Sequence, residues 1–208
     1  MSTPEEIKLH TRLMTEHCLF LYLGIEDTTL RNQAKELYTL WFNYYQNGQG
    51  DLRHLLTTLR VFKEIVLLKL TQGQWLGWLS ASFVDHLLDE LLYFERKLNG
   101  EKLSLAEEAA TAMKAVHHHA ASAESWIDPS EEEWRDVMRA IKDKNKNVPK
   151  NDAQFLIGLS IQNVKELDEH LHNLQINLSK VKTSLHPLLV DHWIREGHDL
   201  LNILSGQK

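Results

Sequence analysis

The chain has 208 residues, of which 43% are hydrophobic and 25% charged, and its formal net charge is −6. This is the composition of an ordinary globular protein, and the length allows one large domain or two small ones. The acidic balance leaves no excess of lysine and arginine to neutralise a phosphate backbone, so we expect no nucleic-acid partner. A single cysteine, Cys18, excludes an intramolecular disulfide and a cysteine-based zinc cluster.

The sequence predicts neither secretion nor a membrane span. The opening residues Met1–Glu6 lack the basic and apolar regions of a signal peptide, and no run of 18 apolar residues occurs. We therefore expect a cytoplasmic protein that does not associate with a membrane.

Helix start and stop signals divide residues 1–100 into four expected helices. Thr3 offers an N-cap followed by Pro4, and Asp27 or Thr28 and then Asp51 offer further caps. Glycine-bearing polar stretches mark the ends. The expected spans are about 4–24, 28–46, 52–73 and 75–98.

Four more helices are expected in residues 101–208. Ser104 and Glu107 form a capping-box pattern at the start of the fifth, and Asp128-Pro129 opens a short sixth. A solvated loop around 142–149 leads to a long helix over about 152–182, and the last runs from near Pro187 to Leu204. Strand signals are nearly absent, so helices joined by short loops predict an all-α fold of up-and-down bundles.

The two halves carry matching motifs. Residues 84–90 and 190–196 share four identities in seven positions at an offset of 106, and both are followed by Leu-x-Gly. The spacing from His17 to Ile25 also equals that from His119 to Ile127. An end motif and the helix stop after it, repeated at one offset, predict a duplication of two four-helix up-and-down bundles, residues 1–100 and 101–208.

Both repeated motifs contain a histidine and a glutamate four residues apart. His86 with Glu90, and His192 with Glu196, therefore lie on one helix face, about one turn apart. The first face also carries Phe83, so the pair is expected to point into its bundle. A buried carboxylate is costly without a partner, and a metal ion or a protonated histidine would supply one.

Facing helices would complete the ligand set. His17 and Glu64 are the first candidates in one half and His119 in the other, where Glu166 and Glu169 stay open as alternatives. Mixed imidazole and carboxylate ligation suits iron, manganese or zinc. The spacing lacks the Glu-x-x-His of di-iron bundles, so a mononuclear site is favoured.

Four segments carry a resemblance to a known family: Glu16–Phe20, Val84–Glu90, Asp128–Glu132 and Val190–Glu196. They resemble the Bacillus metalloprotein-like family of unknown function. The resemblance implies tandem four-helix bundles that bind a metal ion, with iron first, and it implies no known reaction. The resemblance adds Glu16 to the candidate ligands of the first half. In the second half, His118 stands where the family pattern has the corresponding acid. The candidate ligands are Glu16, His17, Glu64, His86, Glu90, His119, His192 and Glu196.

Other classes of function remain as alternatives. The main one is a metal-free helical scaffold or protein-interaction module, and a third is a hemerythrin-like or ferritin-like iron protein that handles oxygen. Phosphate-binding loops, serine-hydrolase elbows and zinc-protease motifs do not occur, so no enzyme class is assigned. The sequence leaves open whether the protein forms a homo-oligomer.

Overall fold

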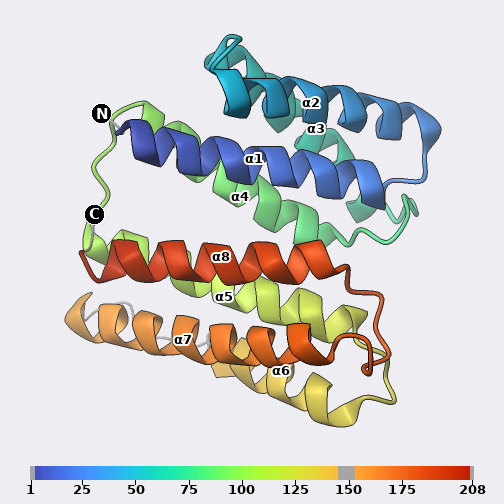
Figure 1. The fold of residues 1–208 in the computed structure, drawn as a ribbon, viewed down its shortest axis with the longest axis vertical. Coiled ribbons are helices and arrows are strands. Elements are labelled where there is room, and N and C mark those ends of the chain that lie inside the picture. Colours follow the sequence, from blue (N-terminus) through green and yellow to red (C-terminus); the bar gives the residue numbers. More distant parts are fainter. Residues whose placement is uncertain (1–2, 145–152, 207–208) are drawn as a thin grey trace. The chain divides into compact units, whose positions relative to one another are not determined.

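The computed structural model describes residues 3–144 and 153–206. Within these residues the chain forms eight α-helices and no β-strand, which confirms the all-α prediction (Figure 1). The chain divides into two compact units, Met1–Lys102 and Leu103–Lys208. None of the described helices has both the length and the apolar character needed to cross a membrane.

Unit 1 contains α1 (Pro4–Gly24), α2 (Thr28–Asn47), α3 (Leu52–Thr71) and α4 (Ala81–Leu98). The predicted caps are in place: Thr3 forms a capping box with Glu6, and the side chains of Asp27 and Asp51 accept from backbone N–H groups of α2 and α3. Helix α1 packs along α2, and α3 along α4 (Figure 1).

The fourth helix begins later than predicted. It starts at Ala81, capped by Ser80, and the expected helical positions Trp75 and Leu79 lie in the preceding loop. This loop is attached to the end of α1: Gly77 forms an antiparallel bridge with Ile25, and Glu26 N–H donates to the carbonyl oxygen of Leu76 at 2.8 Å. Backbone bonding to α1 therefore competes with helix formation here.

Unit 2 contains α5 (Leu105–Trp126), α6 (Glu132–Lys144), α7 (Ala153–Asn177) and α8 (Pro187–Leu204). Helix α6 begins later than predicted because the Asp128 carboxylate accepts from both the backbone N–H and the hydroxyl of Ser130, which makes a turn. Helix α7 ends before the predicted 182, and part of the expected loop at 142–149 lies outside the described residues.

The segment before α8 is also held by a bridge. Ile127, at the end of α5, pairs with Thr183, and Asp128 N–H donates to the carbonyl oxygen of Lys182 at 2.8 Å. In each unit, a backbone bridge thus joins the end of the first helix to the segment that leads into the last one.

Candidate metal centres

In unit 1, helices α1 and α4 bring together three of the predicted ligands. His17 Nε2 lies 2.8 Å from Glu90 Oε2, and His86 Nε2 lies 3.7 Å from Glu90 Oε1. His17 and His86 are buried, and the Glu90 side chain is 13% exposed. The pair on α4 faces the interior, as its i, i+4 spacing on an apolar face predicts.

Unit 2 repeats this arrangement on α5 and α8. His119 Nε2 lies 3.2 Å from Glu196 Oε2, and His192 Nε2 lies 3.8 Å from the same oxygen. All three side chains are buried. Trp193 stacks on the His119 ring with centroids 5.1 Å apart, which fixes the plane of that imidazole.

The carboxylate is placed differently in the two units. In unit 1 the imidazoles approach opposite oxygens of Glu90, whereas in unit 2 both approach Oε2 of Glu196. Two ligand atoms that are each ~2.1 Å from a metal stand ~3.0 Å apart at a right angle and ~3.4 Å apart in a tetrahedron. Each nitrogen–oxygen distance, between 2.8 and 3.8 Å, is therefore close to that of two ligand atoms on one ion.

Sequence reasoning missed Lys63, which lies beside the unit 1 group. This side chain is fully buried, and its Nζ lies 2.6 Å from the carbonyl oxygen of Leu87 and 3.1 Å from Nδ1 of His17. Burial lowers the pKa of Lys63 to about 7, against smaller opposing effects of Cys18 and Glu90. Its position was open to prediction, since it is four residues after Leu59 and three before Val66, on the apolar face of α3.

A protonated Lys63 fixes the state of His17. An ammonium group can only donate, so His17 accepts at Nδ1 and carries its own proton on Nε2, facing Glu90. A metal ion needs the lone pair of Nε2, so metal and proton compete at this position in unit 1. Among the described residues, Lys63 is the only buried lysine, and unit 2 has no counterpart.

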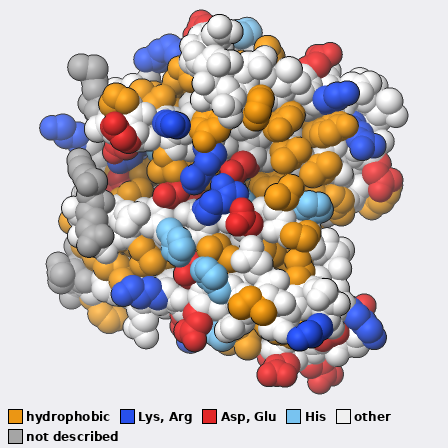
Figure 2. Space-filling model, viewed as in Figure 1, with side chains coloured by type: hydrophobic (Ala, Val, Ile, Leu, Met, Phe, Trp, Pro, Cys, Tyr) orange, Lys and Arg blue, Asp and Glu red, His pale blue; other side chains and the backbone are white. Residues whose placement is uncertain are grey.

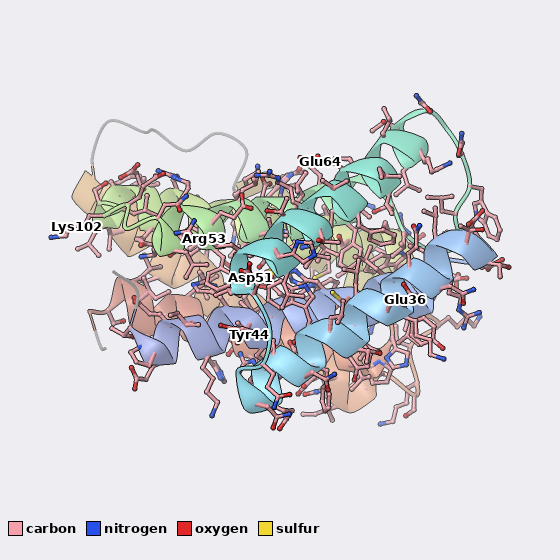
Figure 3. All side chains as sticks on the ribbon, turned by 90° about the horizontal axis from the view of Figure 1, so that it is seen from above. Glu36, Tyr44, Asp51, Arg53, Glu64 and Lys102 are labelled. Atoms are coloured by element: carbon pink, nitrogen blue, oxygen red, sulfur yellow. The ribbon has the colours of Figure 1, made fainter. Side chains whose placement is uncertain are left out.

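Two predicted acidic ligands of unit 1 lie elsewhere. Glu64, labelled in Figure 3, lies on the exposed surface of α3, with Oε1 3.9 Å from Arg60 Nε. The expectation that it points into the bundle is therefore wrong. Glu16 is partly exposed on α1 beside Arg12, at 3.8 Å. Each is one residue, about 100° around its helix, from an inward-facing side chain, which is Lys63 on α3 and His17 on α1.

The two alternatives on helix α7 also face outward. Glu166 Oε1 lies 2.5 Å from Lys144 Nζ in a partly exposed ion pair, and Glu169 is exposed. Neither reaches the unit 2 group in the described structure, whose three candidate ligands lie on α5 and α8.

Two more buried groups of α1 were not among the predicted ligands. His10 stacks on Phe94, with ring centroids 4.7 Å apart, and burial is the main cause that lowers its pKa to about 4. Burial raises the pKa of the Cys18 thiol to about 12, so this sulfur stays protonated and is a poor nucleophile or metal ligand.

His10 should make unit 1 sensitive to acid. Its folded pKa lies below the usual 6.5, so it stabilises the fold above pH 6.5, and this is lost as the pH falls toward 4. We expect His10→Phe to remove about 3 kcal/mol of acid dependence across this window, at ~1.4 kcal/mol per pKa unit. Urea unfolding with a chelator at pH 7, 5.5 and 4 would measure it. The exposed control His54→Phe should keep the wild-type slope, and equal slopes in all three proteins would contradict the assignment.

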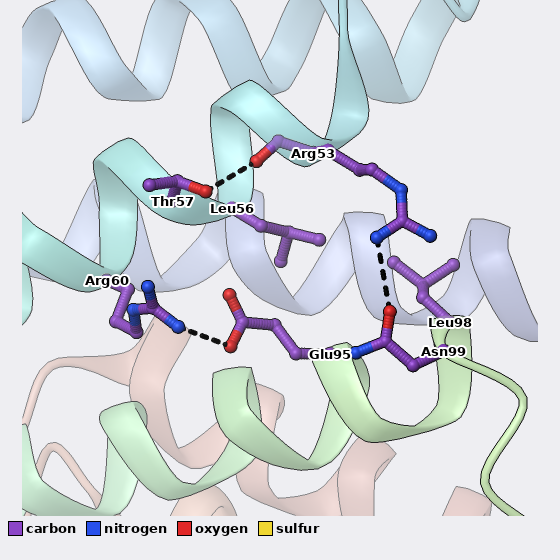
Figure 4. A pocket seen from close by; sticks show the side chains of 7 residues that line it. All are labelled: Arg53, Leu56, Thr57, Arg60, Glu95, Leu98 and Asn99. Atoms are coloured by element: carbon purple, nitrogen blue, oxygen red, sulfur yellow. Dashed lines mark hydrogen bonds and ion pairs between the residues drawn. The ribbon is translucent and has the colours of Figure 1, made fainter.

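A surface pocket between α3 and α4 lies apart from these groups. Its volume is about 150 Å3, and its lining residues form hydrogen bonds and an ion pair with one another (Figure 4). Arg60 donates to Glu95 at 3.0 Å, and Arg53 donates to the Asn99 side-chain oxygen at 3.1 Å. None of the predicted ligands lines it, so the histidine groups remain the candidate site.

No protein-family profile matches the chain. The chain is 25% identical to an uncharacterized protein of Acanthamoeba polyphaga mimivirus, L567. This similarity covers 92% of the chain and 77% of the viral protein. The fold is that of a known structure. A crystal structure of an uncharacterized protein from Bacillus cereus G9241 matches with a TM-score of 0.79 and 16% identity, covering 96% of this chain and 88% of that one. These comparisons support the fold and assign no activity.

Proposed function

We propose that the protein binds transition-metal ions, with one centre in each unit. The observation that carries this proposal is the pairing of two imidazoles with one carboxylate in both units: His17, His86 and Glu90 in unit 1, and His119, His192 and Glu196 in unit 2. Two histidines and a carboxylate form the ligand set of mononuclear non-haem iron, which makes iron the first candidate, with manganese and zinc as alternatives.

Duplication supports this proposal. His17 and His119 are 102 residues apart, as are Ile25 and Ile127 of the two backbone bridges. The offset becomes 106 for His86 and His192, for the two glutamates, and for the bridge partners Gly77 and Thr183. Ligands and bridges that share offsets are explained most simply by two copies of one metal-binding bundle. A metal on three protein ligands keeps coordination positions open for a further ligand.

In this proposal, the centre in unit 2 binds its metal ion more tightly than the centre in unit 1. Both imidazoles of unit 2 lie near one oxygen of Glu196, whereas in unit 1 the buried Lys63 competes for His17. This lysine also motivates a second candidate function. Its ammonium can balance the charge of Glu90, so unit 1 would be a metal-free scaffold attached to one metal-binding unit.

Metal retention in untagged protein tests the proposal. The protein is stripped with a chelator, loaded anaerobically with Fe2+, passed through a desalting column and analysed for iron. We expect His192→Ala/Glu196→Ala to retain one equivalent less than wild type, and His86→Ala/Glu90→Ala to lose a second, more weakly held ion. Circular dichroism should show that the helices persist, since a site added to a core of this size need not drive folding.

The matched controls are Glu64→Ala and Glu166→Ala, which remove acids that lie outside the two groups. Both should keep the wild-type iron content. Loss of iron in the unit 2 variant alone would favour the scaffold role of unit 1. Equal iron in all proteins, or none in wild type, would replace the metal proposal with a metal-free scaffold.

A further inference from the structure

A second cluster of metal-ligating side chains lies on the surface of unit 2. It consists of Asp168 and His172 on α7 and His198 on α8, and each offers a ligand atom within 4.8 Å of the other two. Asp168 Oδ2 lies 3.3 Å from His198 Nε2, and Oδ1 lies 3.6 Å from His172 Nδ1. Figure 2 shows histidine side chains at the surface of this unit.

We propose that Asp168, His172 and His198 form a surface site for a divalent transition-metal ion of the Zn2+ class. Two imidazoles and one carboxylate are a common ligand set for Zn2+, with the remaining positions filled by water. The site goes beyond the interior centres, since it uses none of their ligands.

A metal ion can reach the cluster with little rearrangement of the surrounding side chains. The side chains of His172 and His198 are 46% and 55% exposed, so small rotations that close the ligands around an ion meet few packed neighbours. His172 Nδ1 lies 2.9 Å from the backbone carbonyl oxygen of Asp168, which can only accept, so this nitrogen carries the proton. The lone pair is then on Nε2, so a metal ion would be bound through Nε2 after a small rotation of the ring, and not through the Nδ1 that lies 3.6 Å from Asp168 Oδ1.

The charge of the cluster also favours a cation. Asp168 is only 17% exposed, and no lysine or arginine pairs with it in the described part of the chain. Its ion pairs there are to two imidazoles, which carry charge only when protonated. A divalent ion would supply the positive charge that the carboxylate lacks once the imidazoles are neutral.

The surface cluster is next to the interior group of the same unit. Asp168 and His119 both line a narrow cavity of about 10 Å3, together with Trp193 and Gly197. This volume is close to the minimum for one water molecule. A binding experiment must therefore separate the two sites by variants rather than by position.

The test is calorimetric titration of the chelator-stripped full chain with Zn2+. We expect His172→Ala/His198→Ala to lose one equivalent of Zn2+, and Asp168→Asn to weaken that equivalent at least tenfold. His170→Ala is the matched control, because it lies on α7 about 200° around the helix from His172 and should bind as wild type. A histidine double variant that binds as much Zn2+ as wild type would overturn the surface site, as would unchanged affinity in Asp168→Asn.

The variant Glu196→Gln separates this proposal from the interior centres. It should keep the surface equivalent and change only the interior one. If the interior centres are wrong, Glu196→Gln binds as wild type while the histidine double variant still loses its equivalent. If the surface site is wrong, the double variant is unaffected whatever Glu196→Gln does.

Discussion

Replacing Lys63 by methionine should raise the free energy of unfolding of the metal-free protein by a few kcal/mol at pH 6. The wild-type side chain must enter the core of unit 1 with its charge at this pH, and methionine fills a similar volume without one. Against this gain stand the lost hydrogen bonds to Leu87 and His17, which cost about 1–3 kcal/mol.

The gain should disappear in alkali. The pKa of Lys63 falls from 10.5 in the unfolded chain to about 7 in the fold, so the unfolded state binds more protons between these values. Wild-type stability therefore rises with pH across this window, by an amount on the order of 5 kcal/mol at ~1.4 kcal/mol per unit. Near pH 10 the neutral amine keeps its hydrogen bonds at little cost, and the variant should be no more stable than wild type.

Urea unfolding in EDTA at pH 6, 8 and 9.5 would measure the difference between variant and wild type. The control Lys69→Met removes a lysine at the end of the same helix, where it bonds to Gln74, and its difference from wild type should not vary with pH. A Lys63→Met difference that stays constant over the same range would show that Lys63 does not titrate as a buried group.

Helices were predictable from local signals in this sequence. Caps such as Thr3, Asp27, Asp51 and Ser104 need only their own neighbours, and each caps the helix that was expected after it. The start of α4 was not predictable in the same way. Apolar spacing continues through Trp75 and Leu79, but the bridge that holds this segment is a contact with residues about 50 positions away.

The paired ligands on α4 and α8 were also predictable, since an i, i+4 pair on an apolar face points inward wherever the helix packs. The acid expected from α3 was not placed correctly. Glu64 is the carboxylate that the sequence offers as a ligand on the third helix, but the helical phase places the neighbouring Lys63 inward and Glu64 outward. Each step of one residue along a helix turns the side-chain direction by about 100°. A prediction based on residue type, made without knowing which residues face the core, therefore selects the wrong neighbour.

The backbone bridge between the end of α1 and the segment before α4 should be broken by one added methyl group. This is the second large effect that we expect. Gly77 has φ +122°, and a Cβ there would lie 2.1 Å from the carbonyl oxygen of Gly24 and 3.3 Å from the backbone nitrogen of Glu26. Backbone atoms at a bridge cannot move away cheaply, so Gly77→Ala should destabilise the protein by roughly 3 kcal/mol or more.

Gly73→Ala is the matched control in the same loop, because its φ is also positive, at +79°, but a Cβ there meets nothing within 4 Å. It should cost only about 1 kcal/mol of backbone strain. At ~2–4 °C per kcal/mol, Gly77→Ala should lower the melting temperature by about 6–12 °C and Gly73→Ala by no more than about 4 °C. Equal shifts in the two variants would mean that positive φ alone matters. A larger shift for Gly77→Ala would assign the difference to the bridge, which ties the helix that carries His17 to the segment before the helix that carries His86 and Glu90.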